Sequence, residues 1–161
     1  MSIDFRHLTP TDLVLMQNLL KMFGEAFEDI ETYTTNPPSE DYLRRLLGND
    51  TFIVLTALKN GEVVGGIAAY ELQKFEQERS EIYIYDLAVF ERYRRMGIAT
   101  ALIENLKAIA IDRGAYVIFV QADTNIEDEP AISLYTKLGH REEVLHFDIY
   151  VPPKSSDRSV K

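Results

Sequence analysis

Between residues 13 and 27, apolar side chains recur at three- and four-residue spacing, which predicts an amphipathic helix. Three residues just before this run favour a helix start. Thr9 is suited to cap the helix, Pro10 to its first turn, and Asp12 to the acidic position of a capping box. We therefore expect the first helix to begin close to Pro10.

Three further segments have helical patterns. Ser39 is placed to cap a short helix that ends near Gly48. From Ile98 an apolar face repeats at helical spacing up to Gly114, a residue suited to a left-handed C-terminal cap. A last short helix is expected over residues 130–138.

Strand patterns occupy most of the remaining apolar sequence. A short strand is expected over residues 3–8, and longer ones over 51–58, 63–72 and 81–89. The dipeptide Asn60-Gly61 between the second and third of these is typical of a hairpin turn. These two strands are therefore expected to pair with each other.

The later part of the chain adds two strand predictions. Residues 116–122 are almost continuously apolar, which is typical of a central strand buried on both faces. Residues 146–151 have the pattern of a last strand. The polar stretch 28–38, with two prolines, predicts a loop.

The order of these elements predicts one α/β (α+β) domain over residues 1–151. The strand–helix–strand crossover over residues 81–122 indicates one parallel strand pair inside a mixed, mostly antiparallel central sheet. About four helices flank that sheet. Residues 152–161 are polar and are expected to form a flexible tail.

Composition narrows the classes of function. The formal net charge is −9, which disfavours nucleic acid or an anionic membrane as the main partner and favours a cationic ligand. The chain has no cysteine, so a disulfide framework, a thiolate metal site and a cysteine nucleophile are excluded. No apolar run reaches the length of a membrane span and no signal peptide is recognisable, so a cytoplasmic location is expected.

A basic turn interrupts this acidic chain where the strand over 81–89 leads into the next helix. Arg92, Arg94 and Arg95 supply positive charge, and Gly97 and Ala99 let an anion approach the backbone at a helix N-terminus. The pattern R-x-x-G-x-A therefore favours a phosphate site. The alternative is a solvated basic turn with a packing glycine.

The same pattern resembles the acyl-CoA pyrophosphate loop of the GNAT N-acetyltransferases, and the order of elements fits that fold through nearly the whole chain. Residues 85–89 and the segment AISLYTKLG over 131–139 also resemble that family. Longer strings resemble the gentamicin 3-N-acetyltransferases within it, over residues 74–77, 79–89, 114–118, 120–123, 141–144 and 146–148.

The resemblance implies acetyl-CoA as cosubstrate and no metal. The strands over 81–89 and 116–122 are expected to splay, with the pantetheine arm between them beside the backbone of Leu87, Ala88 and Val89. The N–H of Leu87 or Val89 is also a candidate donor to the thioester carbonyl. The residues implied to hold the pyrophosphate are Arg94, Arg95, Met96, Gly97, Ile98, Ala99 and Thr100.

Two residues are candidates for proton transfer. Asp86 is a charged residue in an apolar and aromatic strand, which is costly unless it is paired or functional, so it is our first candidate for the base. The alternative is a structural Asp that bridges neighbouring strands. The alternation of residues along the strand does not decide from which face of the sheet Asp86 projects. By resemblance, Tyr135 stabilises the departing CoA thiolate; the alternative is a tyrosine that only packs.

Five residues are candidates for binding the acceptor. Glu81 and Asp123 are competing bases or anchors for an ammonium group, and Asp148 closes a strand end. Tyr33 and Tyr85 offer rings on which a sugar can stack.

The resemblance to the gentamicin 3-N-acetyltransferases implies acetylation of the 3-amino group of a 2-deoxystreptamine aminoglycoside, a modification that confers antibiotic resistance. Without cysteine, direct transfer in a ternary complex is the simpler mechanism. One alternative is a GNAT enzyme for another small cation, such as a polyamine or a peptide amine. Another is a non-catalytic acyl-CoA-binding module. The resemblance implies a homodimer.

Overall fold

The computed structural model describes residues 2–154, and its contacts divide the chain into two compact units. The first unit, Met1–Asp123, contains the sheet, and the second begins at Thr124. The elements of the first unit are β1 (Asp4–His7), α1 (Leu13–Ala26), η1 (Glu31–Thr35), α2 (Glu40–Leu47), β2 (Phe52–Lys59), β3 (Glu62–Gln73), β4 (Ser80–Val89), η2 (Glu91–Tyr93), α3 (Ile98–Arg113) and β5 (Ala115–Val120). The second unit contains η3 (Ile126–Asp128) and α4 (Glu129–Leu138).

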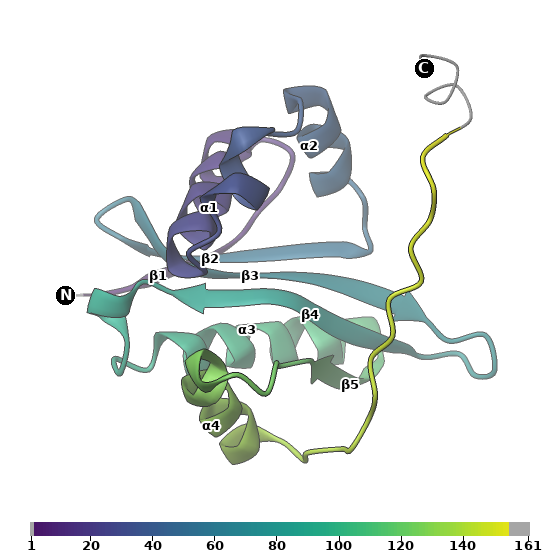
Figure 1. Ribbon diagram of the computed structural model, residues 1–161. Coiled ribbons are helices and arrows are strands. Elements are labelled where there is room, and N and C mark those ends of the chain that lie inside the picture. The colour runs from purple at the N-terminus through teal and green to yellow at the C-terminus, as the bar shows by residue number, and fades with distance from the viewer. Residues whose placement is uncertain (1, 155–161) are drawn as a thin grey trace. The chain divides into compact units, whose positions relative to one another are not determined.

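The first unit is a three-layered structure around a mixed sheet. Its five strands lie in the order β1-β2-β3-β4-β5, with antiparallel pairing throughout except between β4 and β5, which are parallel. Figure 1 shows α1 and α2 on one face of this sheet and α3 on the other. The predicted mixed, mostly antiparallel sheet with one parallel pair is therefore confirmed.

Local signals in the sequence account for several boundaries. Asn60 and Gly61 both have positive φ, 51° and 81°, as a tight hairpin turn between β2 and β3 requires. The Ser39 side chain accepts a hydrogen bond from the backbone N–H of Tyr42 at 3.1 Å and caps α2. Gly114 closes α3 in the left-handed conformation, with φ of 74°.

The start of α1 differs from the prediction. The helix begins at Leu13 rather than near Pro10, because residues 9–12 form a separate turn. In that turn Asp12 is buried, and its Oδ2 accepts hydrogen bonds from the backbone N–H and the hydroxyl of Thr9 at 2.8 and 3.2 Å. The polar stretch 28–38 is also not wholly a loop, since η1 is a single π-helical turn within it.

Two strand predictions near the end of the chain are wrong. The strand β5 is not central: it is the last strand of the sheet, and none of its residues is fully buried. In the described part of the chain, residues 140–154 form no strand, so the last strand expected over 146–151 is absent. Apolar, β-branched sequence is compatible with a strand, but a strand forms only when a neighbour pairs with its backbone groups.

Apolar burial holds the first unit together on both faces of the sheet. Fully buried side chains come from α1 (Leu19, Phe23), from the strands (Ile67, Ile82) and from α3 (Leu102). No helix within residues 2–154 is long and apolar enough to cross a membrane. Most of the tail expected over 152–161 lies outside the described residues.

Candidate active site

The strands β4 and β5 pair over only part of their length. Their pairing runs from Ser80–Ala115 to Ile84–Val120, whereas β4 continues to Val89. On that side of β4, the backbone of residues 85–89 therefore has no partner in β5. The pairing stops because β5 ends at Val120, so the expected splaying of the two strands stays a prediction, while Leu87, Ala88 and Val89 lie along the part of β4 that β5 leaves unpaired.

A β-bulge at Tyr85 decides which face of the sheet Asp86 occupies. Asp86 lies opposite Ala68 and Ile84 lies opposite Ala69, so Tyr85 is an extra residue without a partner in β3. In a regular strand, Asp86 would project from the same face as Ile84. The bulge turns it to the face of Tyr83, which is the face covered by α1 and α2.

Asp86 is held there by a hydrogen bond from a distant part of the chain. The Tyr33 hydroxyl, on η1, donates to Asp86 Oδ2 at 2.8 Å. Burial raises the pKa of the Asp86 carboxyl, and the hydrogen bond from Tyr33 partly opposes that rise. Burial, followed by the interaction with Asp86, raises the pKa of Tyr33, so its hydroxyl stays protonated and remains a donor.

The position of Tyr33 depends on α1. Its ring lies 6.0 Å from that of Phe23 and 5.8 Å from that of Phe27, measured between ring centroids. A Cβ at Gly24 would lie 3.2 Å from the Tyr33 Cβ, closer than a side chain comfortably allows. Gly24, in the last turn of α1, therefore lets η1 pack closely enough for Tyr33 to reach Asp86.

A row of aromatic rings crosses the same face of the sheet. Phe52 on β2 contacts Tyr70 on β3, and Tyr70 contacts Tyr85 on β4, with centroid distances of 5.1 and 6.0 Å. Tyr83 lies 5.9 Å from Tyr85 and stacks on Phe119 of β5 at 4.8 Å. The side chain of Tyr85 is 62% exposed, so the row presents an open aromatic surface beside Asp86.

Sequence reasoning singled out Tyr33 and Tyr85 but missed the rest of this row and Gly24. The alternation of tyrosines in the segment IYIYD was a usable signal for Tyr83. No signal pointed to Tyr70 or Phe119, because only the register of the sheet brings them into line.

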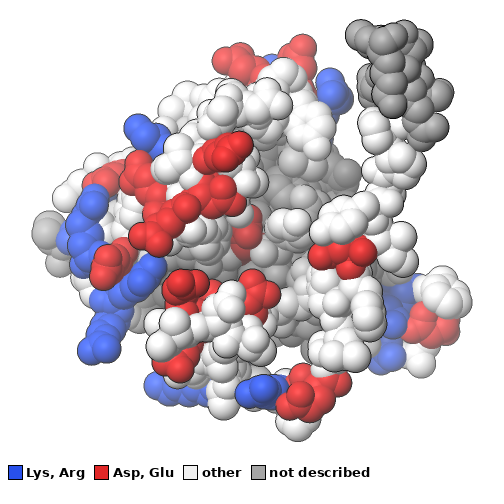
Figure 2. All heavy atoms as spheres, in the orientation of Figure 1, with Lys and Arg blue, Asp and Glu red and all other residues white. Residues whose placement is uncertain are grey.

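The basic turn after β4 has the geometry of an anion site. Gly97, the N-cap of α3, has φ of 78°, and a Cβ added there would meet nothing within 4 Å. Arg95 also has positive φ, 64°, and the Arg94 Nε donates to the Val89 carbonyl at 3.1 Å. Figure 2 shows basic side chains gathered at this edge, where β4 leads through η2 toward α3. Arg92 is engaged elsewhere, since it pairs with Glu62 at 2.8 Å.

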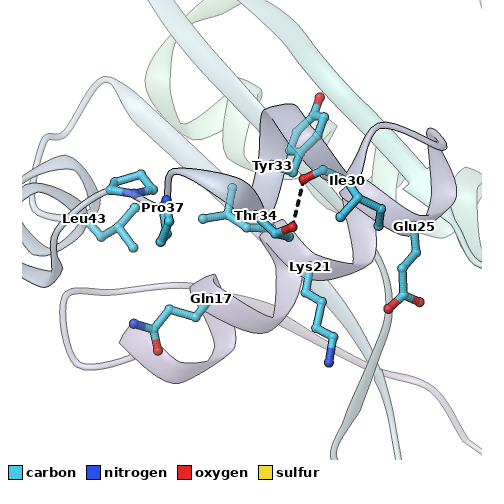
Figure 3. Close-up of a pocket in the computed structure, with 10 residues that line it drawn as sticks. Gln17, Lys21, Glu25, Ile30, Tyr33, Thr34, Pro37 and Leu43 are labelled. Carbon is cyan, nitrogen blue, oxygen red and sulfur yellow. Dashed lines mark hydrogen bonds between the residues drawn. The ribbon is translucent and has the colours of Figure 1, made fainter.

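A cavity of about 310 Å³ lies between α1, η1 and α2 (Figure 3). Gln17 and Lys21 of α1 line it together with Thr34, whose hydroxyl donates to the Ile30 carbonyl at 2.8 Å. Tyr33 also lines the cavity, although its ring points away from Gln17 and Lys21. The residue that holds Asp86 is therefore also part of a cavity wall.

Of the other predicted acceptor residues in the first unit, Glu81 lies apart from Asp86. Glu81 is five positions earlier on β4, which corresponds to about 17 Å along a strand. The hydrogen bond from Tyr116, and then the nearby Lys74 ammonium, lower the pKa of Glu81. Asp123 is exposed and follows the end of β5.

Two predicted residues belong to the second unit. Tyr135 lies on α4, and its backbone carbonyl accepts a hydrogen bond from Gly139 at 2.8 Å. Asp148 is exposed and its Oδ1 lies 2.9 Å from the His146 Nε2. Within the described residues, no group of three His, Asp or Glu side chains is arranged to hold a metal ion.

The chain is similar to known proteins over most of its length. The model of the acetyltransferase (GNAT) family matches residues 16–140. An N-alpha-acetyltransferase of Sulfurisphaera tokodaii is 32% identical over 92 residues, which are 50% of this chain and 54% of that protein. The chain therefore spans about half the length of that curated relative.

Solved structures give longer matches. An aminoglycoside acetyltransferase from an uncultured soil metagenomic sample is 68% identical, with a TM-score of 0.93 over 94% of this chain and 100% of that chain. A second aminoglycoside acetyltransferase from such a sample, in complex with sisomicin, is 30% identical, with a TM-score of 0.85 over 93% and 97% of the two chains.

Proposed function

Because this chain belongs to the GNAT family of acetyltransferases and has its fold, we propose that it transfers an acetyl group from acetyl-CoA to an amine of an aminoglycoside. The position of Asp86 carries the proposal: the bulge turns this carboxylate to the aromatic face, next to the part of β4 that has no β5 partner. The 68% identity to a solved aminoglycoside acetyltransferase supports the substrate class.

The residues of the open part of β4 and of the basic turn fit acetyl-CoA. Backbone groups without a β5 partner at Leu87 and Val89 suit the amides of a pantetheine arm. The left-handed Gly97, with open space beside its Cα, and the guanidinium groups of Arg94 and Arg95 suit a pyrophosphate. When bound, acetyl-CoA supplies the activated acyl group as a thioester.

Asp86 takes the proton that the acceptor amine must lose. An ammonium group cannot attack a carbonyl, so a base is needed before or during attack. Burial raises the pKa of the Asp86 carboxyl toward the working pH, which makes it a better proton acceptor than an exposed aspartate. Tyr33 orients this carboxylate through its 2.8 Å hydrogen bond.

Two further groups stabilise charge that develops during transfer. The N–H of Leu87 or Val89 donates to the carbonyl oxygen of the acyl group, and one such donor is worth roughly 3 kcal/mol. Tyr135 donates a hydrogen bond to the leaving thiolate. Since the chain has no cysteine, an acetyl-enzyme on a thiol is excluded, and direct transfer to the amine in a ternary complex is the simpler mechanism.

We assign the acceptor position to the 3-amino group of 2-deoxystreptamine drugs of the gentamicin type. The support is the resemblance of residues 79–89 and 120–123 to enzymes of that specificity. The aromatic row beside Asp86 offers sugar rings an apolar surface, and the net charge of −9 attracts a polycation. Acetylation removes a positive charge from the drug, which is how the enzyme confers resistance. We place it in the cytoplasm as a homodimer.

A second acceptor class is a peptide α-amine, favoured by the 32% identity to an N-alpha-acetyltransferase over half of the chain. Release of CoA, detected with a thiol reagent, separates the two classes, and a chain without cysteine adds no background. Gentamicin should give turnover, while spermidine and short peptides should not.

Gentamicin already acetylated at the 3-amino group is the control for position, and it should be inert. Turnover with that derivative would place the reaction at another amine. Turnover with peptides alone would overturn the aminoglycoside assignment, and none with any amine would indicate an acyl-CoA-binding module.

A further inference from the structure

The cavity between α1, η1 and α2 has the size and the lining of a small-molecule site. Its volume of about 310 Å³ lies at the lower end of the range of roughly 300–1,000 Å³ that is usual for such sites. Its apolar wall comes from α1, from α2 and from the residues on both sides of η1, and consists of Leu20, Ile30, Pro37, Pro38 and Leu43. Ile30 is 49% exposed, so part of this apolar surface is left for a ligand to cover.

Polar side chains of α1 stand along one side of the cavity. Gln17, Lys21 and Glu25 are spaced four residues apart, so they lie on one face of the helix (Figure 3). Within residues 2–154, neither Lys21 nor Glu25 forms an ion pair or a side-chain hydrogen bond. A ligand that carries one charge of each sign matches these two side chains, because each charge then gains a partner of opposite sign.

An α-amino acid with an apolar side chain combines both features. Its side chain suits the apolar wall, its carboxylate suits the Lys21 ammonium, and its ammonium group suits the Glu25 carboxylate. Side chains four residues apart on a helix have Cβ atoms only about 5–6 Å apart, so two long side chains can converge on one small molecule.

Tyr33 connects this cavity with Asp86. It lines the cavity, but its ring points away from the polar residues of α1, and its hydroxyl donates to Asp86 Oδ2 at 2.8 Å. No residue of η1 is fully buried, so this π-helical turn has no core of its own to fix its position. A ligand that contacts Ile30 and Thr34 adds contacts to this turn, and it therefore stabilises the arrangement in which Tyr33 reaches Asp86.

We propose that the cavity binds a free α-amino acid with an apolar side chain, and that the bound amino acid holds Tyr33 against Asp86. The ligand's carboxylate pairs with Lys21, its ammonium group pairs with Glu25, and its side chain covers Ile30. Neither the binding nor its coupling to Asp86 depends on the acetyltransferase function. Only the consequence for catalysis, a more firmly oriented base, rests on the proposed function.

Calorimetry with L-leucine and L-phenylalanine, without acetyl-CoA, tests the site. We expect saturable binding, and roughly tenfold weaker binding of N-acetyl-leucine and of leucinamide, each of which lacks one of the two charges. Lys21→Gln and Glu25→Gln should weaken L-leucine binding to a similar extent. Lys107→Gln and Glu104→Gln change an exposed ion pair on α3 and are the matched controls, which should bind L-leucine normally. No binding of either amino acid, or equal binding of N-acetyl-leucine, would overturn the site.

The same measurement tests the coupling, since two sites that affect each other do so reciprocally. Asp86 does not line the cavity, so Asp86→Ala can act on L-leucine only through Tyr33. We expect about fivefold weaker L-leucine binding to Asp86→Ala, and the same loss for Tyr33→Phe, which keeps the ring and loses only the hydroxyl. Asp112→Ala on α3 is the control and should bind normally.

Hydrogen exchange reports on the turn itself. The amides of residues 30–35 should exchange more slowly when L-leucine is bound, because the ligand adds contacts to η1. Unchanged L-leucine affinity in both Asp86→Ala and Tyr33→Phe, or unchanged exchange over 30–35, would overturn the coupling. None of these experiments involves acetyl transfer, so their failure and the failure of the proposed function are distinguishable.

Discussion

Replacing Asp86 with Asn should reduce activity and raise stability, a combination expected only of a functional carboxylate. The side chain keeps its shape, and its carbonyl oxygen still accepts the hydrogen bond from Tyr33 now seen at 2.8 Å. Only the capacity to take a proton is lost. A positioned general base contributes about two to four orders of magnitude, so we expect a loss in kcat of that size, or about 3–5 kcal/mol of barrier.

The effect on stability follows from the raised pKa of Asp86. A carboxyl whose pKa is higher in the folded protein than its ordinary value of 3.8 binds its proton more tightly when folded. Its ionised form therefore lowers stability at neutral pH, and this cost disappears as pH falls through the folded pKa. Asparagine resembles the protonated form, so Asp86→Asn should unfold at a higher temperature than the wild type at pH 7 but not near pH 4.

The assays are CoA release at saturating gentamicin over a range of pH, and thermal unfolding at both pH values. Residual activity of Asp86→Asn should increase with pH, since more of the amine is then neutral. Asp112→Asn, an exposed aspartate on α3, is the matched control and should change neither property. A loss in kcat below tenfold would refute the role as base, and a lower unfolding temperature at pH 7 would make Asp86 a structural residue.

Three further substitutions test the rest of the site. Tyr33→Phe removes the hydrogen bond that lowers the pKa of Asp86, so the acidic limb of the pH–rate profile should move to higher pH. A limb that does not move would show that Tyr33 does not lower the pKa of Asp86. Gly97→Asp should reduce the affinity for acetyl-CoA, measured by calorimetry, by at least tenfold. Gly61→Asp is the control: it imposes comparable backbone strain at a similar φ of 81° in the β2–β3 turn, and this variant should bind acetyl-CoA normally. Tyr135→Phe should lower kcat about tenfold and leave the affinity for acetyl-CoA unchanged, because one hydrogen bond that forms as the thiolate leaves is lost. An unchanged kcat would show that Tyr135 only packs.

The sequence alone determined the elements whose causes are local. The Asn60-Gly61 turn, the Ser39 cap and the Gly114 cap each depend on the conformational preference of one or two residues. The crossover between β4 and β5 follows from the order of elements, so the parallel pair was predictable as well. Gly97 in the basic turn was also singled out from the sequence, although its left-handed conformation was first seen in the structure.

Only the tertiary structure decided what depends on pairing between distant segments. The face of Asp86 is set by the single extra residue at Tyr85, because alternation alone would have left Asp86 on the same side as Ile84. Its hydrogen bond comes from Tyr33, fifty-three residues away, through the packing that Gly24 permits. The segment over 146–151 has the pattern of a strand but forms none in the described chain, because strand formation requires a partner that its own sequence does not supply.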